Sequence, residues 1–397
     1  MGFRGKNKVF TRRKLMQQAT AAGISGLCAT ALTADDVRGA DSDQVPISMD
    51  AGGTWIKYVP KDWFERVQNA KTAKNTLAEE FMAEDEVLEV VYSSGNHGGE
   101  NPHVIITLDE DSENKDQLRG EIPERENDTP VRIREGAFFH EDPCDICDTE
   151  CDERILSNPD TLPGGYRVRF SGQNGDYVGT LTSLTKHNNY YNYGWSTSAH
   201  IVSSAFEGCG ADLIGKNAYH NDTYIGSVNY INHDTDFAFI AADGSVDPWE
   251  SNLFDYDPDR SSFVVHDTLT DEGIDEHIAN EGDYDYLVRK TGIASCQTNG
   301  FVKSRGRRTI DKTDRDPCKN YYENQIGWGV ACEDNGDGGD PGIDCGDSGS
   351  LTWTTHPDDP YFYAVCINHR FTVSNRIAGT SGPKLRQQEG FWWEEYN

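Results

Sequence analysis

Three residues far apart in this chain have the side chains that nucleophilic catalysis at a carbonyl carbon requires. Ser348 lies in GDSGS, His200 ends TSAH, and Asp236 begins the segment DFAFI. A serine hydroxyl becomes a nucleophile when an imidazole takes its proton, and a carboxylate fixes the imidazole tautomer and stabilises its charged form. Glycines on both sides of the serine leave room for backbone N–H groups to face a ligand. The set predicts acyl-transfer chemistry.

Each role has an alternative that the sequence leaves open. Asp234 competes with Asp236 as the carboxylate, because it lies two residues earlier and so on the same side of an extended chain. We prefer Asp236, since the apolar alternation begins directly after it. The backbone N–H groups of Gly346 and Ser348 are expected to form an oxyanion hole. Asp347 is expected to be buried behind that hole and paired with a cation.

The elements that must hold these residues are mostly strands. From residue 163 onward, short apolar segments alternate with Gly, Asn and Asp and show almost no helical periodicity, which predicts an all-β region. The candidate strands are YRVRF, YVGTLTSL, AHIVSS, DFAFIAA, YLVRKTG, SLTWTT and YFYAVCI. A region of this kind folds as a sandwich or as one or two barrels.

The part of the chain before this region has a different pattern. KDWFERVQNAKTAKNTLAEEF places Trp63, Val67, Ala70, Leu77 and Phe81 near one face of a helix. EVLEVVYSS, PHVIITLDE and TPVRIRE follow as short strands, so residues 41–140 are expected to form a small α+β domain, either a pro-region or an accessory domain.

Residues 141–162 are rich in cysteine and acid and are expected to be a linker. His140, Cys144, Cys147 and Cys151 lie close together, and four such ligands can close around zinc. They form one short run rather than two separated pairs, so we favour disulfide bonding of the linker and expect no metal. The chain has 10 cysteines. If Cys28 is removed with a signal peptide, at least one of the rest is unpaired or joins two chains.

Residues 1–40 have the features of a twin-arginine export signal: a basic start, the pair Arg12 and Arg13, and a mildly apolar run before acidic residues. Cys28 raises the alternative of a lipid anchor, but Leu27 stands where a small residue is expected. No later segment approaches about 20 apolar residues, so no membrane span is expected. The protein is expected to work outside the cell, where disulfides are common.

The composition is strongly acidic. The chain of 397 residues carries 67 Asp and Glu against 36 Lys and Arg, a formal net charge of -31. This charge makes nucleic acid and anionic membrane surfaces poor partners. The acid is spread between apolar segments along the whole chain, and such a surface is typical of proteins adapted to high salt, where the Debye length falls to roughly 3 Å.

The sequences of these motifs and their order along the chain resemble those of one family. TSAH is similar to the TAAH, DFAFI to the DIAL-type segment, and GDSGS to the GDSGG of the chymotrypsin-like (trypsin superfamily) serine peptidases, in the same order His, Asp, Ser. An α/β-hydrolase or a subtilisin has a different order. The resemblance covers about residues 163–375, and VRKTGIASCQTNGFV is closest to the streptogrisin-like branch. It implies a double six-stranded β-barrel over residues 163–397, with the triad in the cleft between the barrels.

Several positions depart from that family. Ile201 follows His200 where the animal enzymes have a cysteine, and Cys345 lies one residue later than the usual cysteine, with Cys366 or Cys318 as candidate partners. Gly342 stands where trypsins carry the aspartate that binds basic side chains, so cleavage after Arg or Lys is not supported. LPGGY offers a processing point near Gly164, although no IVGG-like start is present.

The resemblance implies a secreted serine endopeptidase that needs no cofactor and acts on proteins or peptides through an acyl-enzyme. Ser348 would be the nucleophile, His200 the general base, and Asp236 the residue that orients it. The alternatives are a protease-like protein that has lost activity and serves as a binding or surface module, or an acidic surface-layer protein in which the three motifs coincide by chance. The N-terminal domain is expected to act on the peptidase domain in cis.

Overall fold

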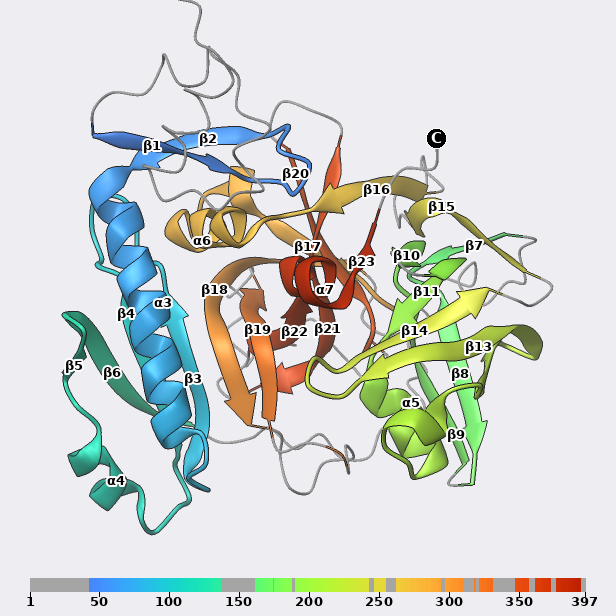
Figure 1. The fold of residues 1–397 in the computed structure, drawn as a ribbon, viewed down its shortest axis with the longest axis horizontal. Coiled ribbons are helices and arrows are strands. Elements are labelled where there is room, and N and C mark those ends of the chain that lie inside the picture. Colours follow the sequence, from blue (N-terminus) through green and yellow to red (C-terminus); the bar gives the residue numbers. More distant parts are fainter. Residues whose placement is uncertain are drawn as a thin grey trace, which may run out of the picture.

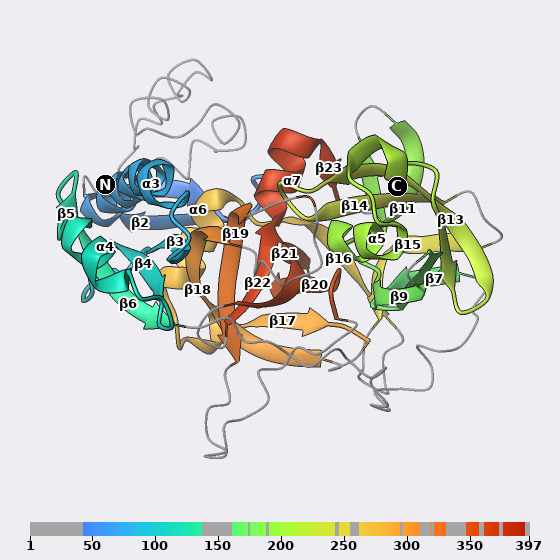
Figure 2. The same ribbon diagram turned by 90° about the horizontal axis from the view of Figure 1, so that it is seen from below.

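The structure is a computed structural model. It describes residues 43–136, 161–173, 175–187, 190–242, 246–254, 262–293, 297–309, 318, 321–330, 347–356, 361–372 and 376–393. The export signal and the linker cysteines of the sequence analysis lie outside these ranges. Three parts lie side by side in the order N-terminal unit, second barrel, first barrel (Figures 1 and 2).

The N-terminal unit is a sheet covered by one long helix. Its elements are β1 (Gln44–Ser48), β2 (Ile56–Pro60), α3 (Lys61–Phe81), β3 (Val87–Ser93), β4 (His103–Asp109), α4 (Lys115–Glu121), β5 (Arg125–Glu126) and β6 (Thr129–Gly136). The amphipathic helix predicted from the sequence is α3, and all the residues predicted for its apolar face are buried. The predicted strands are β3, β4 and β6.

The first barrel is a closed ring of antiparallel strands. They are β8 (Arg167–Gly172), β9 (Gly175–Thr180), β11 (Tyr190–Thr197), β12 (Asn217–His220), β13 (Thr223–Asn232) and β14 (Phe237–Ala242). Their order in space is β9-β8-β12-β13-β14-β11. The chain just past β9 closes the ring, because the N–H of Thr182 donates to the carbonyl of Ser196 over 2.8 Å.

The second barrel repeats this order. Its strands are β17 (Val288–Thr291), β18 (Gln297–Thr309), β19 (Tyr321–Val330), β20 (Leu351–Thr355), β21 (Phe362–Thr372) and β22 (Arg376–Ser381). The pairs β17-β18, β18-β19, β19-β22, β22-β21, β21-β20 and β20-β17 are all antiparallel and close the ring. The expected all-β fold with two six-stranded barrels of the chymotrypsin-like type is confirmed.

The remaining elements connect the barrels and cover their ends. They are β7 (Thr161–Gly164), β10 (Thr185–His187), α5 (Ala199–Phe206), β15 (Asp247–Phe254), β16 (Ser262–Thr268), α6 (Asp271–Ala279), α7 (Gly382–Glu389), β23 (Phe391–Trp392), and 3-10 turns at Gly210–Leu213 and Tyr284–Tyr286. The expected near-absence of helix after residue 163 is wrong for α5, α6 and α7.

AHIVSS was expected to be a strand, and it is the start of helix α5. The β-branched pair Ile201 and Val202 favours a strand, but both side chains are buried in the core of the first barrel together with Ala199 and Ala205. Burial of a helical face outweighs the local propensity here.

Two contacts tie the parts together. Apolar side chains between the barrels form one cluster that includes Phe237, Phe239, Leu351 and Trp353, and the disulfide Cys209–Cys318 joins the loop after α5 to the chain before β19. Within the described residues, no helix is both long and apolar enough to cross a membrane.

Candidate active site

The N-terminus of helix α5 positions the histidine. Its first amides have no partner inside the helix, and Asp236 supplies the acceptors: the N–H of His200 donates to Asp236 Oδ1 over 2.7 Å, and the N–H of Ala199 donates to the Asp236 carbonyl over 3.2 Å. His200 Nδ1 lies 2.7 Å from Asp236 Oδ2. An ionised carboxylate only accepts, so Nδ1 carries the proton and Nε2 is left to act as a base.

Asp236 is held in an unusual state. It is fully buried, and its backbone is left-handed with φ 47°. Burial opposes ionisation, but the imidazoles of His200 and His369 beside the carboxylate outweigh that cost and hold the pKa of Asp236 well below its usual range. The carboxylate is therefore ionised at neutral pH. The His200 side chain is 16 % exposed, so its base can reach a substrate.

Ser348 approaches the histidine from the second barrel. Its Oγ lies 3.2 Å from His200 Nε2. Its single proton is donated to the carbonyl of His369 in this structure, so it must rotate toward His200 Nε2 before that nitrogen can accept it. The next residue has φ 90°, and a Cβ there would lie 2.2 Å from Thr197 Oγ1, so only glycine fits at Gly349. Gly349 of the motif is therefore required by the turn that presents the Ser348 hydroxyl.

Asp347, next to the serine, is fully buried and forms an ion pair with Lys290 of β17, which is also fully buried. The expectation that this aspartate is buried and paired with a cation is confirmed. The strand alternation of β17 places Lys290 on the same inward face as Val288. A lysine on an apolar face was the sequence signal for this partner, and it was missed.

A second histidine contacts the Asp236 carboxylate. His369 of β21 is buried, and its Nδ1 lies 2.7 Å from Asp236 Oδ2. Its ring is 5.2 Å from the ring of Tyr322. The sequence analysis did not identify His369, and no motif surrounds it that could have done so.

The structure brings His200, Asp236 and Ser348 together and leaves Asp234 apart. Asp234 is exposed, and its backbone N–H donates to Asn232 Oδ1. The backbone N–H and the Nδ1 of His200 both contact Asp236. The proposed oxyanion-hole donor Gly346 lies outside the described residues, as do Gly342 and Cys345.

The cysteines require a correction. Cys318, one candidate partner of Cys345, is bonded to Cys209. The other, Cys366, is a buried thiol whose sulfur contacts Asn368. Cys318 is therefore excluded as the partner of Cys345, which itself lies outside the described residues. The spacing of Cys318 along the chain did not reveal a partner in the other barrel. The cluster of His140, Cys144, Cys147 and Cys151 lies outside the described residues, and among those described no group of three or more His, Cys, Asp or Glu could hold a metal ion.

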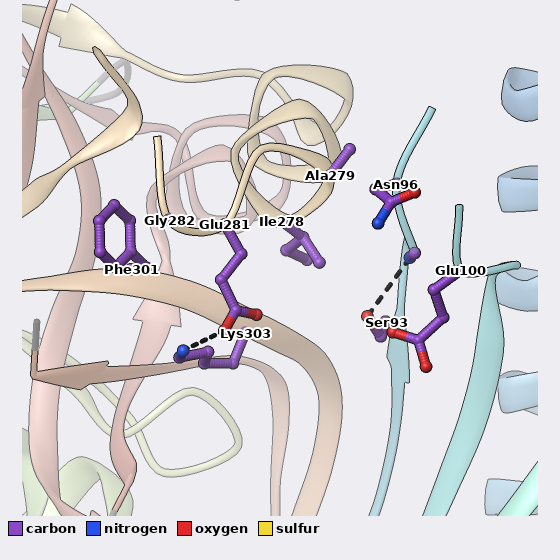
Figure 3. Close-up of a pocket in the computed structure, with 10 residues that line it drawn as sticks. Ser93, Asn96, Glu100, Ile278, Ala279, Glu281, Gly282, Phe301 and Lys303 are labelled. Carbon is purple, nitrogen blue, oxygen red and sulfur yellow. Dashed lines mark hydrogen bonds and ion pairs between the residues drawn. The ribbon is translucent and has the colours of Figure 1, made fainter. Parts of the chain in front are cut away.

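A separate pocket of about 410 Å³ lies between the N-terminal unit and the second barrel (Figure 3). Ser93, Asn96 and Glu100 line one side, and Glu281 and Lys303, which pair with each other, line the other. His200, Asp236 and Ser348 do not line this pocket.

No protein-family model matches this sequence, and no curated protein matches it. Solved structures of serine proteases do match its fold. A Nocardiopsis protease is 13% identical with a TM-score of 0.40, covering 59% of this chain and 99% of its own. Protease A of Thermobifida fusca is 13% identical with a TM-score of 0.38, covering 59% and 100%. A Cellulomonas bogoriensis chymotrypsin is 14% identical with a TM-score of 0.38, covering 59% and 100%. These neighbours are chymotrypsin-like serine proteases; the assignment of the fold to this chain rests on the strand order of its two barrels.

Proposed function

We propose that this protein is a serine endopeptidase with His200, Asp236 and Ser348 as its triad. One observation carries the proposal: an ionised, buried carboxylate, an imidazole and a serine hydroxyl lie in one line of contacts of 2.7 and 3.2 Å where the two barrels meet. This is the arrangement that acyl transfer through a serine requires.

The reaction follows from these contacts. Ser348 Oγ attacks the carbonyl carbon of a peptide bond while His200 Nε2 takes its proton, and Asp236 stabilises the imidazolium that results. His200 then gives the proton to the leaving amine, and water attacks the acyl-enzyme by the same route. In the proposal, the N–H groups of Gly346 and Ser348 hold the oxyanion, and loss of one such donor costs about 2.7–4 kcal/mol of activation free energy.

A phosphonate probe tests the proposal. Folded protein in concentrated salt is treated with a serine-reactive fluorophosphonate, and labelling and casein hydrolysis are compared between the wild type, Ser348→Ala and His200→Ala. Labelling is expected in the wild type alone. His220→Ala and His233→Ala are matched controls, because their rings contact the Arg167 carbonyl and the Gly210 amide, away from Ser348. Labelling that survives Ser348→Ala contradicts the proposal.

The alternative of an inactive binding module is not favoured by any contact among the described residues. Such a protein has no need of a buried carboxylate with a lowered pKa or of a base exposed beside a serine. If the protein were an inactive binding module, the correctly folded wild type would not be labelled by the fluorophosphonate.

We further propose that the N-terminal unit is retained as an accessory domain and is not removed as a pro-region. Strand β3 continues the second barrel: it pairs with β18 from Arg305↔Tyr92 to Arg308↔Glu89. Val90 of β3 shares one apolar cluster with Val302, Ile326 and Trp328 of the barrel. Loss of the unit would expose both a strand edge and this core.

Buried charges cross the same junction. Helix α6 carries Asp275, which accepts from Tyr92 Oη over 2.7 Å and pairs with Lys71 over 2.6 Å. Its neighbour Glu276 pairs with Lys57 over 2.6 Å. Asp275 and Glu276 are buried. Tyr92, Lys71 and Lys57 belong to the N-terminal unit, as does His97, whose Nε2 lies 2.8 Å from Glu276. Removing the unit would leave two carboxylates without these partners, and such changes typically cost about 3–5 kcal/mol for one buried pair.

The processing point near Gly164 fits this proposal poorly. Gly164 is buried inside β7, and a Cβ there would lie 2.2 Å from the Ser183 amide. N-terminal sequencing and intact mass of secreted, active protein test the retention. A chain that begins near residues 35–41 is expected, and full activity in a chain that begins near residue 163 would overturn it.

Export through the twin-arginine route and adaptation to salt complete the proposal. Helix α3 ends with Glu79 and Glu80 and has no basic residue in its last turn, an unfavourable arrangement for the helix dipole that salt screens. The free energy of unfolding is expected to rise with NaCl. A stability that is independent of salt from 0.1 to 3 M, roughly the range over which screening changes most, would contradict the adaptation. Replacing Arg12 and Arg13 by Lys is expected to stop export.

A further inference from the structure

The disulfide between Cys209 and Cys318 joins the helix of His200 to the second barrel. Cys209 lies three residues after Phe206, where helix α5 ends, and His200 lies in the first turn of the same helix. Cys318 lies three residues before Tyr321, where strand β19 of the second barrel begins. The bond is therefore attached to the helix end that points away from the site.

The second barrel also holds the turn that carries Asp236. The N–H of Glu323, in β19, donates to the carbonyl of Asp234 over 3.0 Å. The hydroxyl of Thr380, in β22, donates to the carbonyl of Thr235. Two successive carbonyls of the turn are thus fixed by the second barrel, and the fully buried Asp236 is the next residue.

These contacts form a closed circuit through the site. The Asp236 turn binds the start of α5, because the N–H of His200 donates to Asp236 Oδ1 over 2.7 Å. The end of α5 is joined by the disulfide to the chain that enters β19, and Glu323 of β19 returns to the turn. Hydrogen bonds connect the segments at two places and the disulfide connects them at the third. Of these three links, the disulfide opens only by a chemical reaction.

The disulfide can be reached from solvent. Cys209 is exposed and Cys318 is half-buried, and exposed disulfides are the ones that thiols reduce readily. A dithiol breaks the S–S bond by supplying two electrons and a proton to each protein sulfur, and the dithiol becomes a disulfide. Oxidised glutathione reverses the step: the two protein thiols lose their protons, the S–S bond forms, and two molecules of glutathione thiol leave.

We propose that Cys209 and Cys318 are positioning residues whose disulfide holds the Asp236 turn against the helix of His200, so that peptidase activity depends on oxidation of this pair. The inference rests on the proposed function, because it concerns the control of that triad. Thiols in the cytoplasm keep such bonds open, whereas disulfides persist outside the cell. The protein would then be weakly active before the proposed export and would be activated outside by exchange with an oxidised disulfide.

Thiol treatment of the folded wild type tests the proposal. With dithiothreitol we expect kcat to fall roughly 10- to 100-fold, as when a reacting group is misplaced by about 1 Å. We expect KM to stay within about twofold, because the base is displaced and the substrate-binding surface is not. Oxidised glutathione should restore kcat, except in reduced protein whose thiols have been capped with iodoacetamide. Circular dichroism shows whether the reduced protein is folded.

The double variant Cys209→Ser/Cys318→Ser is the matched control for the other cysteines of the chain. It retains all of them, so dithiothreitol should leave its kcat unchanged, at the level of the reduced wild type. A further loss in this variant would assign the effect to other cysteines and overturn the inference. A purely structural role of the disulfide predicts lower stability in the reduced protein with an unchanged kcat, and that result would also overturn it.

A readout without turnover decides the case independently. In Ser348→Ala protein, the Nδ1–H of His200 that faces Asp236 gives a downfield 1H signal, which His200→Ala assigns. We expect this signal to broaden on reduction and to return on oxidation, and an unchanged signal contradicts the inference. An oxidised wild type that the fluorophosphonate does not label would contradict the proposed peptidase alone. A labelled wild type with equal kcat before and after reduction would contradict the role of the disulfide alone.

Discussion

The two barrels share one strand order but hold their parts of the site in different ways. The first barrel supplies His200 and Asp236, which are locked together by the N-terminus of α5. The second barrel supplies Ser348, which follows Asp347 of the buried ion pair with Lys290. Strand β3 and helix α6 join this barrel to the N-terminal unit. His200 is thus positioned by local contacts within one barrel, whereas Ser348 follows a buried ion-paired residue in a barrel that also pairs with the N-terminal unit.

In the first barrel, Asp236→Asn is expected to cause the largest loss of activity. The amide can still accept from the backbone N–H of His200, but it no longer selects the tautomer or stabilises the imidazolium. We expect kcat to fall by about 10⁴-fold with little loss of stability. Asp234→Asn, at the exposed neighbour, should stay within about twofold of the wild type, as for surface changes. Equal losses in both variants would return the role to Asp234.

In the second barrel, Lys290→Met is expected to cause a large loss of stability. It removes the cation that pairs with the buried Asp347 carboxyl, which we expect to lower the free energy of unfolding by about 3–5 kcal/mol. Lys303→Met is the matched control, since its partner Glu281 is exposed, and an exposed pair contributes about 0–1 kcal/mol. Urea unfolding measures both. A Lys290→Met protein as stable as the control would contradict the role given to the buried pair.

The disulfide between the barrels offers a covalent test. Cys209 and Cys318 are 109 residues apart in sequence, and the double Ser variant is expected to lose about 2–4 kcal/mol of stability. Each single Ser variant should lose the same amount, because either one breaks the bond. Single losses that add up in the double variant would show that the cysteines act separately.

The smallest expected effect concerns the pH dependence of stability. Burial lowers the pKa of His277 from 6.5 to about 4, against the raising effect of its bond to the Gly273 carbonyl. The unfolded chain binds a proton first as the pH falls, so stability is lost from about pH 6.5 down to about pH 4, by up to about 3 kcal/mol. His277→Asn should flatten the curve in this window. A variant curve parallel to that of the wild type would contradict this cause.

The sequence could reveal the site where a motif fixes the chemistry. The flanking residues and the order along the chain were enough to identify Ser348, His200 and Asp236 as candidates. Helix α3 could be predicted because its apolar residues recur with helical spacing. The helix at His200 could not be foreseen, because Ile201 and Val202 favour a strand and the capping carboxylate comes from a turn 36 residues away.

His369 was equally out of reach. Its contact with Asp236 depends on a bulge in β21 and on how one barrel packs against the other. Neither feature produces a recognisable sequence pattern. Lys290 lies between these cases: its place on an inward strand face was visible, but its partner was not.

The backbone of Asp236 restricts which amino acids can replace it. A φ of 47° is tolerated by aspartate and asparagine, whereas other side chains with a Cβ pay about 1–2 kcal/mol for it. Glutamate has the right charge, but it combines this penalty with a longer reach, so the two acidic residues are not interchangeable here. Asparagine, which has the same shape and no charge, is therefore the replacement that removes the carboxylate without this backbone penalty.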